Sequence, residues 1–346
     1  MIFNRSPMGL NFKPKLALYL ILAGLTGQPL LSSAQQNLQF SQYVFNMLSV
    51  NPAYAGYKED LFLNAVYRKQ WVNFPGGPQT GGVSVDGALN ASKDNRVGLG
   101  MQIMYDKLGP QDATSIYGMY SYRIPLNADG DKRLCLGVGA GVTQYALDGQ
   151  AMKYNDANDP AIPLGRASTW VPDARFGVYY YTSRFYAGAS VMDLFSLYTD
   201  ASRYYWQGYQ YRTIRKTQHL YVNAGAVFNF SENLKFKPSI LVKEDFKGPT
   251  NVDLTAMFLI ADRLWAGASY RTGVKLWSKP ALDPALEQLD AASIIAMFNI
   301  TNQLRIGYAY DLTINKMASF QSGSHEISVG FLFPTRRDRV ISPRYF

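Results

Sequence analysis

The ten residues Leu304-Arg-Ile-Gly-Tyr-Ala-Tyr-Asp-Leu-Thr313 alternate strictly between two kinds of side chain. Leucine, isoleucine and tyrosine occupy one set of positions, whereas glycine, alanine and polar residues occupy the other. A β-strand points successive side chains to opposite faces, so this alternation predicts a strand with one apolar face and one small or polar face. A soluble sheet would fill its second face with lysine and glutamate. The pattern here is typical of a membrane barrel with lipid outside and a polar interior.

The same period of two recurs along most of the chain. Each repeat is long enough for the roughly nine to eleven residues with which a tilted strand crosses a bilayer. Single-chain bacterial barrels have an even number of strands. We therefore predict an all-β fold, a 14-stranded antiparallel transmembrane β-barrel, with strands at residues 61–70, 79–90, 96–106, 113–125, 133–147, 173–182, 184–194, 218–230, 234–246, 251–261, 263–275, 290–300, 302–313 and 324–333.

The connections between these predicted strands alternate in length. With the N-terminus in the periplasm, the periplasmic connections are all short turns. Most connections on the other side are longer, 107–112 among them, and 148–172 and 195–217 exceed twenty residues, although 247–250 is short. Short periplasmic turns and long extracellular loops are typical of outer-membrane barrels.

The composition excludes several classes of site. Of the 346 residues, 14% are aromatic and only 17% are charged, which favours β-structure. A single cysteine, Cys135, rules out an intrachain disulfide framework and a multi-cysteine metal site. The two histidines, His219 and His325, have no evident catalytic partner in the sequence. We therefore predict no cofactor, no metal and no catalytic residues, so the protein is not expected to be an enzyme.

Residues 1–34 have the features of a secretory signal peptide. Three positive charges at Arg5, Lys13 and Lys15 precede an apolar run, and Ser32-Ser33-Ala34 offers a cleavage site of small residues. We predict cleavage near Ala34 and location in the outer membrane of a Gram-negative cell; an N-terminal membrane anchor is the alternative. The chain then divides into a signal peptide (1–34), a periplasmic or plug segment (35–60), the barrel (61–333) and a basic periplasmic tail (334–346).

The segment Phe40–Gly56 is too apolar to lie free in the periplasm. We expect it against or inside the barrel mouth as a partial plug, with a turn at Asn51-Pro52. Farther along, lysines 235, 237 and 243 share one strand face, and neighbouring inward faces carry aspartates, glutamate and arginines. These charges predict ion pairs within the lumen, and an anion-selective channel is the alternative.

Several motifs together resemble the PorP/SprF family of the type IX secretion system of Bacteroidetes. The resemblance extends over the whole mature chain and rests on Asn51-Pro-Ala-Tyr-Ala-Gly56, Tyr67-Arg-Lys-Gln-Trp71, Pro75-Gly-Gly-Pro-Gln-Thr80, Tyr310-Asp-Leu-Thr313, His325-Glu-Ile-Ser-Val-Gly-Phe331 and Pro343-Arg-Tyr-Phe346.

This resemblance implies a non-enzymatic outer-membrane component. It would anchor or deliver a secreted, adhesin-like cargo protein at the cell surface, as in gliding motility, through the cargo's type B C-terminal domain. The alternative implied by the family is a machine component that links the outer membrane to periplasmic ring and motor proteins. A passive porin-like channel is a further alternative.

Aromatic and arginine residues gather in the predicted extracellular loops. Such residues form protein-binding hot spots because they bury a large area at little entropic cost. The alternative is an aromatic girdle with basic contacts to outer-membrane lipid and lipopolysaccharide. An extracellular position argues against a nucleic-acid partner. The predicted cargo-binding residues are Trp71, Phe74, Tyr198, Tyr204, Tyr205, Trp206, Tyr209, Tyr211 and Arg212.

Two further predictions concern the periplasmic side and a loop. We expect periplasmic or plug contacts from Asn51, Pro52, Tyr54, Arg336, Arg337 and Arg339, because the basic tail suits an acidic or phosphate-rich periplasmic surface. In the loop at 148–172, Asn155–Asp159 carries enough oxygen ligands for Ca²⁺, although its spacing is not that of an EF-hand. A solvated turn is the alternative there.

Overall fold

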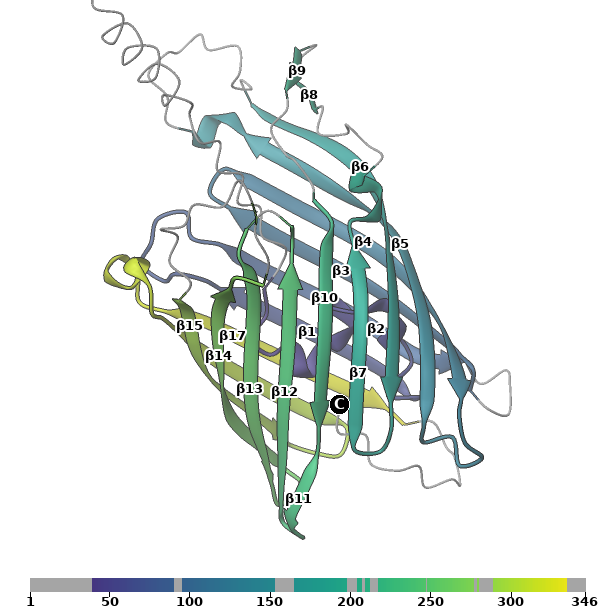
Figure 1. The fold of residues 1–346 in the computed structure, drawn as a ribbon. Coiled ribbons are helices and arrows are strands. Elements are labelled where there is room, and N and C mark those ends of the chain that lie inside the picture. The colour runs from purple at the N-terminus through teal and green to yellow at the C-terminus, as the bar shows by residue number, and fades with distance from the viewer. Residues whose placement is uncertain are drawn as a thin grey trace, which may run out of the picture. The chain divides into compact units, whose positions relative to one another are not determined.

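The computed structural model describes residues 39–89, 95–152, 165–197, 204–206, 209–211, 217–246, 248–276, 279 and 289–334. These residues form an antiparallel β-barrel (Figure 1). Its strands are β1 (Leu61–Lys69), β2 (Gln79–Leu89), β3 (Val97–Leu108), β4 (Gln111–Pro125), β5 (Arg133–Asp148), β6 (Arg166–Tyr181), β7 (Phe185–Met192), β8 (Tyr204–Trp206), β9 (Tyr209–Tyr211), β10 (His219–Ala226), β11 (Phe228–Ser231), β12 (Leu234–Glu244), β13 (Thr250–Ile260), β14 (Leu264–Val274), β15 (Leu289–Asn299), β16 (Leu304–Thr313) and β17 (Ser324–Phe333).

The strand pairing closes the barrel. Consecutive wall strands pair with one another, and β1 also pairs with β17. The remaining gap is closed by β10, which pairs with both β7 and β12. After an interruption at Val227, β11 continues β10 along the same partner, β12, so the two segments make one crossing. The described wall therefore has fourteen crossings, which confirms the predicted 14-stranded barrel.

Two of the predicted connections between strands are shorter in the structure, because the strands beside them are longer. Strands β3 and β4 are longer than predicted and are joined by a tight turn at Gly109-Pro110, so the predicted loop at 107–112 does not exist. Gly109 has the positive φ that this turn needs. Strand β6 begins at Arg166, seven residues before the predicted start at residue 173. Pro172 lies within β6, where it is paired with Val142 of β5.

The two faces of the wall have the polarity of a membrane barrel. Every second residue of the strands is buried toward the interior, and these positions carry many small or polar side chains. The outer face instead exposes large apolar side chains, which suits contact with lipid. In β3 this outer row consists of Leu99, Met101, Ile103 and Tyr105, each more than 40% exposed.

Helical structure in the described residues is limited to short 3₁₀ turns. These are η1 (Tyr43–Phe45), η2 (Met47–Ser49), η3 (Pro52–Tyr54), η4 (Gly149–Ala151), η5 (Leu194–Leu197) and η6 (Lys316–Phe320). Within the described ranges, no helix has the length and apolar character needed to cross a membrane.

Candidate functional site

Residues 39–58, here called the plug segment, lie inside the barrel. Nearly every side chain from Phe40 to Tyr57 is buried, and the purple turns of this segment lie within the ring of strands in Figure 1. The apolar members from Tyr43 onward pack in one core with inward-facing wall residues such as Tyr179, Met257 and Ile295, whereas Phe40 packs with Val66 and Met104. Burial also raises the pKa of the Tyr43 hydroxyl well above its usual value, so this side chain is a neutral phenol.

The plug segment descends from the extracellular side of the lumen to the periplasmic side. Taking the side with the longer connections as extracellular, Ser41 contacts Arg68, one residue from the extracellular end of β1. A few residues later, the Phe45 carbonyl accepts a hydrogen bond of 2.8 Å from Arg305, near the periplasmic end of β16. The rest of the segment then contacts Ser190 of β7 and Ser121 of β4 before the chain enters β1.

A buried ion-pair cluster holds the upper end of the plug segment. The Arg68 guanidinium lies 2.9 Å from a Glu326 oxygen and 2.5 Å from an Asp311 oxygen, and all three side chains are at most 3% exposed. The Ser41 amide donates to Glu326 at 2.8 Å, and the Ser41 hydroxyl donates to Asp311 at 2.7 Å. Three barrel strands and the plug segment therefore share one set of charge-assisted bonds.

The lumen contains a second cluster of paired charges, as the inward lysines and carboxylates predicted. Asp253 on β13 accepts from Lys243 on β12 at 2.7 Å and from Arg271 on β14 at 2.6 Å. Lys237 is different: its ammonium group lies 3.5 Å from the Val44 carbonyl and within 6 Å of the Phe45 and Trp265 rings. The lysine thus contacts the plug segment through a carbonyl dipole and aromatic faces.

Asn51 shapes the lower part of the plug segment. Its side-chain oxygen accepts from the Ala53 amide at 2.9 Å, which caps η3 with Pro52 at the first position. Its side-chain nitrogen donates to the carbonyls of Val178 and Ala189, at 3.0 and 3.3 Å. One asparagine therefore fixes the local turn and ties it to β6 and β7. Tyr54 then stacks on Tyr57, with ring centroids 4.9 Å apart.

Glycines in the wall make room for this turn. A Cβ atom at Gly137 would lie 2.2 Å from the Ala53 amide nitrogen, and one at Gly177 would lie 2.1 Å from the Asn51 side-chain oxygen. Both distances are far below contact, so only glycine allows the plug backbone to lie this close. The small second face of these strands, visible in the sequence, is thus the surface on which the plug segment rests.

Replacing Gly137 by alanine should therefore destabilise the plugged barrel. The new methyl group meets backbone atoms of Ala53, and overpacking of this kind typically costs about 1–3 kcal/mol. Thermal unfolding in detergent, followed by the shift in gel mobility, measures the change. Gly118→Ala is the matched control, because its added Cβ would have only one neighbour, at 4.0 Å. Equal stability of the two variants would contradict this packing.

The predicted cargo-binding residues Trp71 and Phe74 lie on an extracellular platform, defined as residues 70–78 and 314–323. The two loops are joined by backbone hydrogen bonds of 2.9 Å from Val72 to Gly323 and 2.8 Å from Ser322 to Val72. The Trp71 and Phe74 rings meet edge to face, with centroids 6.1 Å apart, and Phe74 is 37% exposed. The platform therefore presents aromatic surface on a fixed backbone.

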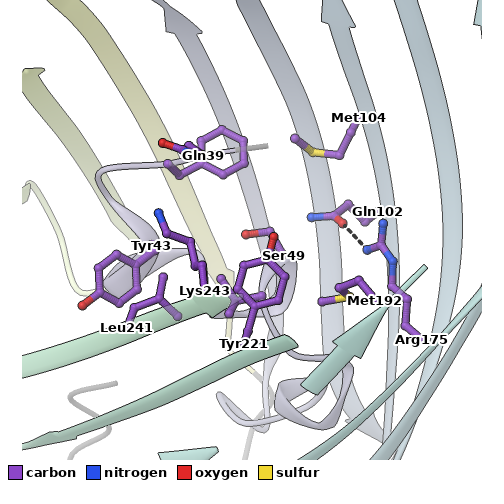
Figure 2. A pocket seen from close by; sticks show the side chains of 12 residues that line it. Gln39, Tyr43, Ser49, Gln102, Met104, Arg175, Met192, Tyr221, Leu241 and Lys243 are labelled. Atoms are coloured by element: carbon purple, nitrogen blue, oxygen red, sulfur yellow. Dashed lines mark hydrogen bonds between the residues drawn. The ribbon is translucent and has the colours of Figure 1, made fainter. Parts of the chain in front are cut away.

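Above the plug segment lies a pocket lined by both the plug and the wall (Figure 2). Gln39, Tyr43 and Ser49 line its plug side, and β3, β6, β7, β10 and β12 supply the rest. Its volume is about 30 Å³, enough for a few water molecules or one small polar group. Arg175 and Lys243 are the charged side chains among the lining residues.

Several predicted sites fall partly or wholly outside the described residues. Tyr204, Tyr205, Trp206, Tyr209 and Tyr211 belong to the β8–β9 hairpin, of which the structure describes only the backbone. Outside the described residues lie Tyr198, Arg212, Arg336, Arg337, Arg339, the signal-peptide region 1–34 and the candidate calcium segment 155–159.

Other contacts were not expected from the sequence. His219 lies 3.3 Å from an Asp193 oxygen, and His325 lies 2.6 Å from the Tyr308 hydroxyl. In the buried ion-pair cluster, Arg68 donates a hydrogen bond to Ser41, 27 positions away in the sequence. Ser41 in turn donates to Asp311, which is 270 positions away. The sequence placed Asp311 and Glu326 on inward faces and predicted ion pairs in the lumen, but it did not identify Arg68 or Ser41 as their partners.

Comparisons with known proteins found one family model and several solved structures that are similar to this chain. A family model described as "Type IX secretion system membrane protein PorP/SprF" matches residues 32–331. No curated protein matches the chain. Similar solved structures include Omp33 of Acinetobacter baumannii, with 10% identity over 80% of this chain and 98% of that chain, and a TM-score of 0.44. A Pseudomonas aeruginosa FadL homologue has 14% identity over 84% and 94% of the two chains, with a TM-score of 0.43. The CymD monoaromatic hydrocarbon channel has 12% identity over 85% and 93%, with a TM-score of 0.45.

Proposed function

We propose a specific secretion role for this chain, which belongs to the PorP/SprF family of type IX secretion system membrane proteins. Family membership confirms the resemblance seen in the sequence and identifies an outer-membrane secretion component. The proposed role is to anchor or deliver a secreted cargo protein at the cell surface, without catalysis. The extracellular loops hold the cargo, and the periplasmic ends contact ring or motor proteins.

The observation that carries this proposal is the filled lumen. The plug segment bonds to wall residues on many sides of the barrel, including Ser121, Ser190 and Arg305. Because it crosses the lumen between β16, β7 and β4, it blocks the path that a passive porin needs. A plugged barrel with a rigid aromatic platform is better suited to holding a protein than to passing solutes.

Affinity purification from the native outer membrane tests the proposal. The barrel is extracted gently in detergent with an affinity tag, and the recovered proteins are identified by mass spectrometry. Recovery of a large secreted protein through its C-terminal domain supports cargo anchoring. Recovery of periplasmic ring or motor proteins without cargo would instead support the machine-component alternative. A barrel that purifies alone and conducts ions would contradict both.

The platform gives the cargo assignment a direct mutational test. In the double variant Trp71→Ala/Phe74→Ala, we expect the recovered cargo to fall at least about tenfold, since aromatic anchors carry much of the energy of protein interfaces. The barrel itself should appear in the membrane at an unchanged level. Tyr270→Ala is the matched control, because Tyr270 is an exposed aromatic residue on the outer face of β14, away from the platform. Equal cargo recovery from both variants would exclude the platform as the contact surface.

A further inference from the structure

The pocket above the plug segment has an excess of positive charge. Its lining includes Arg175 and Lys243 and no carboxylate. Lys243 is neutralised from outside the lining by Asp253, at 2.7 Å. Arg175 has no carboxylate partner among the residues that the structure describes. The nearby Asp173 accepts instead from the Tyr117 hydroxyl at 3.0 Å and from the Phe195 amide at 3.4 Å.

The Arg175 guanidinium is held in place but not saturated. One face lies 3.4 Å from the centre of the Tyr117 ring, and Nη1 donates to the Gln102 side-chain oxygen at 3.3 Å (Figure 2). Its Nε is buried and has no hydrogen-bond partner in the described structure. A buried donor without an acceptor is costly, so this arrangement favours an incoming acceptor.

The position of the pocket determines from which side a ligand enters. Tyr43, Ser49 and Val50 of the plug segment line one side of the pocket. Met192 and Lys243 lie at or next to the extracellular ends of β7 and β12. Among the described residues, the pocket therefore lies on the extracellular side of the plug residues that line it.

We propose that this pocket binds the terminal carboxylate of a secreted polypeptide. The inference rests on the proposed cargo role and names the chemistry by which the cargo would be recognised. A guanidinium offers a planar pair of donors that matches a carboxylate, and a volume of about 30 Å³ suits this one group, with the rest of the chain end outside the pocket. A pocket closed on one side accepts a chain end, whereas the middle of a chain would need a second opening to leave.

Calorimetric titration of the purified full-length barrel in detergent tests the proposal. The probes are N-acetyl-L-leucine, which carries a carboxylate, and N-acetyl-L-leucinamide, which is its neutral counterpart. We expect saturable binding of the carboxylate and binding of the amide at least about tenfold weaker, because the charge-assisted bonds are lost. The Arg175→Met variant should bind N-acetyl-L-leucine at least about tenfold more weakly than the unmodified barrel. The affinity of Arg175→Lys should lie between those of the two.

Arg166→Met is the matched control, because Arg166 is a largely exposed arginine on the same strand and outside the pocket. Heat-dependent gel mobility checks that each variant is folded. If Arg175→Met does not fold, Gln102→Leu provides the second test, since it removes the acceptor that orients the guanidinium and should weaken binding. Equal affinity for acid and amide, or unchanged binding in the Arg175 or Gln102 variants, would overturn the proposal. Tight binding of inorganic phosphate without competition from N-acetyl-L-leucine would also overturn it.

The same variants separate this inference from the cargo role. If cargo copurifies equally with the unmodified barrel and with Arg175→Met, the cargo role stands and the carboxylate pocket is excluded. If cargo is absent from both while N-acetyl-L-leucine still binds through Arg175, the pocket stands and the cargo role fails.

Discussion

Arg68→Met should lower the free energy of unfolding by about 3–5 kcal/mol, the usual effect of removing one partner from a buried charged cluster. The methionine fills a similar volume but leaves the Asp311 and Glu326 carboxylates buried together without their shared cation. Ser41 also loses a contact with the guanidinium. Urea unfolding in detergent, followed by tryptophan fluorescence, measures the loss.

A matched control and a rescue variant make this result specific. Arg166→Met removes an arginine that is 59% exposed in its side chain and pairs with Asp112, and we expect a loss below about 1 kcal/mol. Adding Asp311→Asn and Glu326→Gln to Arg68→Met should restore part of the stability, because the uncompensated charges are removed. A small effect of Arg68→Met, similar to that of the Arg166 control, would show that the cluster does not hold the barrel and plug together.

The wall of the barrel could be predicted from the sequence because its physical signal is local. Strands such as Leu304–Thr313 and Ser324–Phe333 alternate apolar residues with small or polar ones, and this pattern directly reflects lipid on one side and the lumen on the other. The errors lie where the pattern is interrupted. The predicted loop extended to residue 172, yet β6 begins at Arg166 and continues through Pro172, which pairs with Val142.

The contacts within the lumen could not be predicted in the same way. A plug inside the mouth follows from the apolar character of Phe40–Gly56, but its path depends on partners far along the chain. Ser41 meets Asp311 and Glu326, and Asn51 meets the carbonyls of β6 and β7. The pocket around Arg175 likewise requires five strands and the plug segment at once. A local pattern carries no information on such long-range pairing.

Deleting residues 39–56 should convert the barrel into an ion channel. A 14-stranded barrel without its plug leaves a lumen lined by small and polar residues, and single-channel conductance in planar bilayers should rise at least about tenfold. The unmodified chain is expected to show low conductance, because the plug segment crosses the lumen from β16 to β7 and β4. Heat-dependent gel mobility checks that the deletion variant is folded as a barrel before its conductance is measured.

A milder variant keeps this prediction testable if the deletion prevents folding. Ser41→Ala/Asn51→Ala leaves the plug segment in the chain. It removes the Ser41 hydroxyl's bonds with Asp311 and Arg68 and the Asn51 amide's bonds to the carbonyls of Val178 and Ala189. With both ends of the plug less firmly held, we expect brief openings rather than a permanently open pore. Gly118→Ala, which alters the wall away from the plug, should behave like the unmodified chain. If the deletion and the double variant both conduct no better than the unmodified barrel, something other than the plug segment closes the lumen, and the argument from the filled lumen to cargo anchoring fails with it.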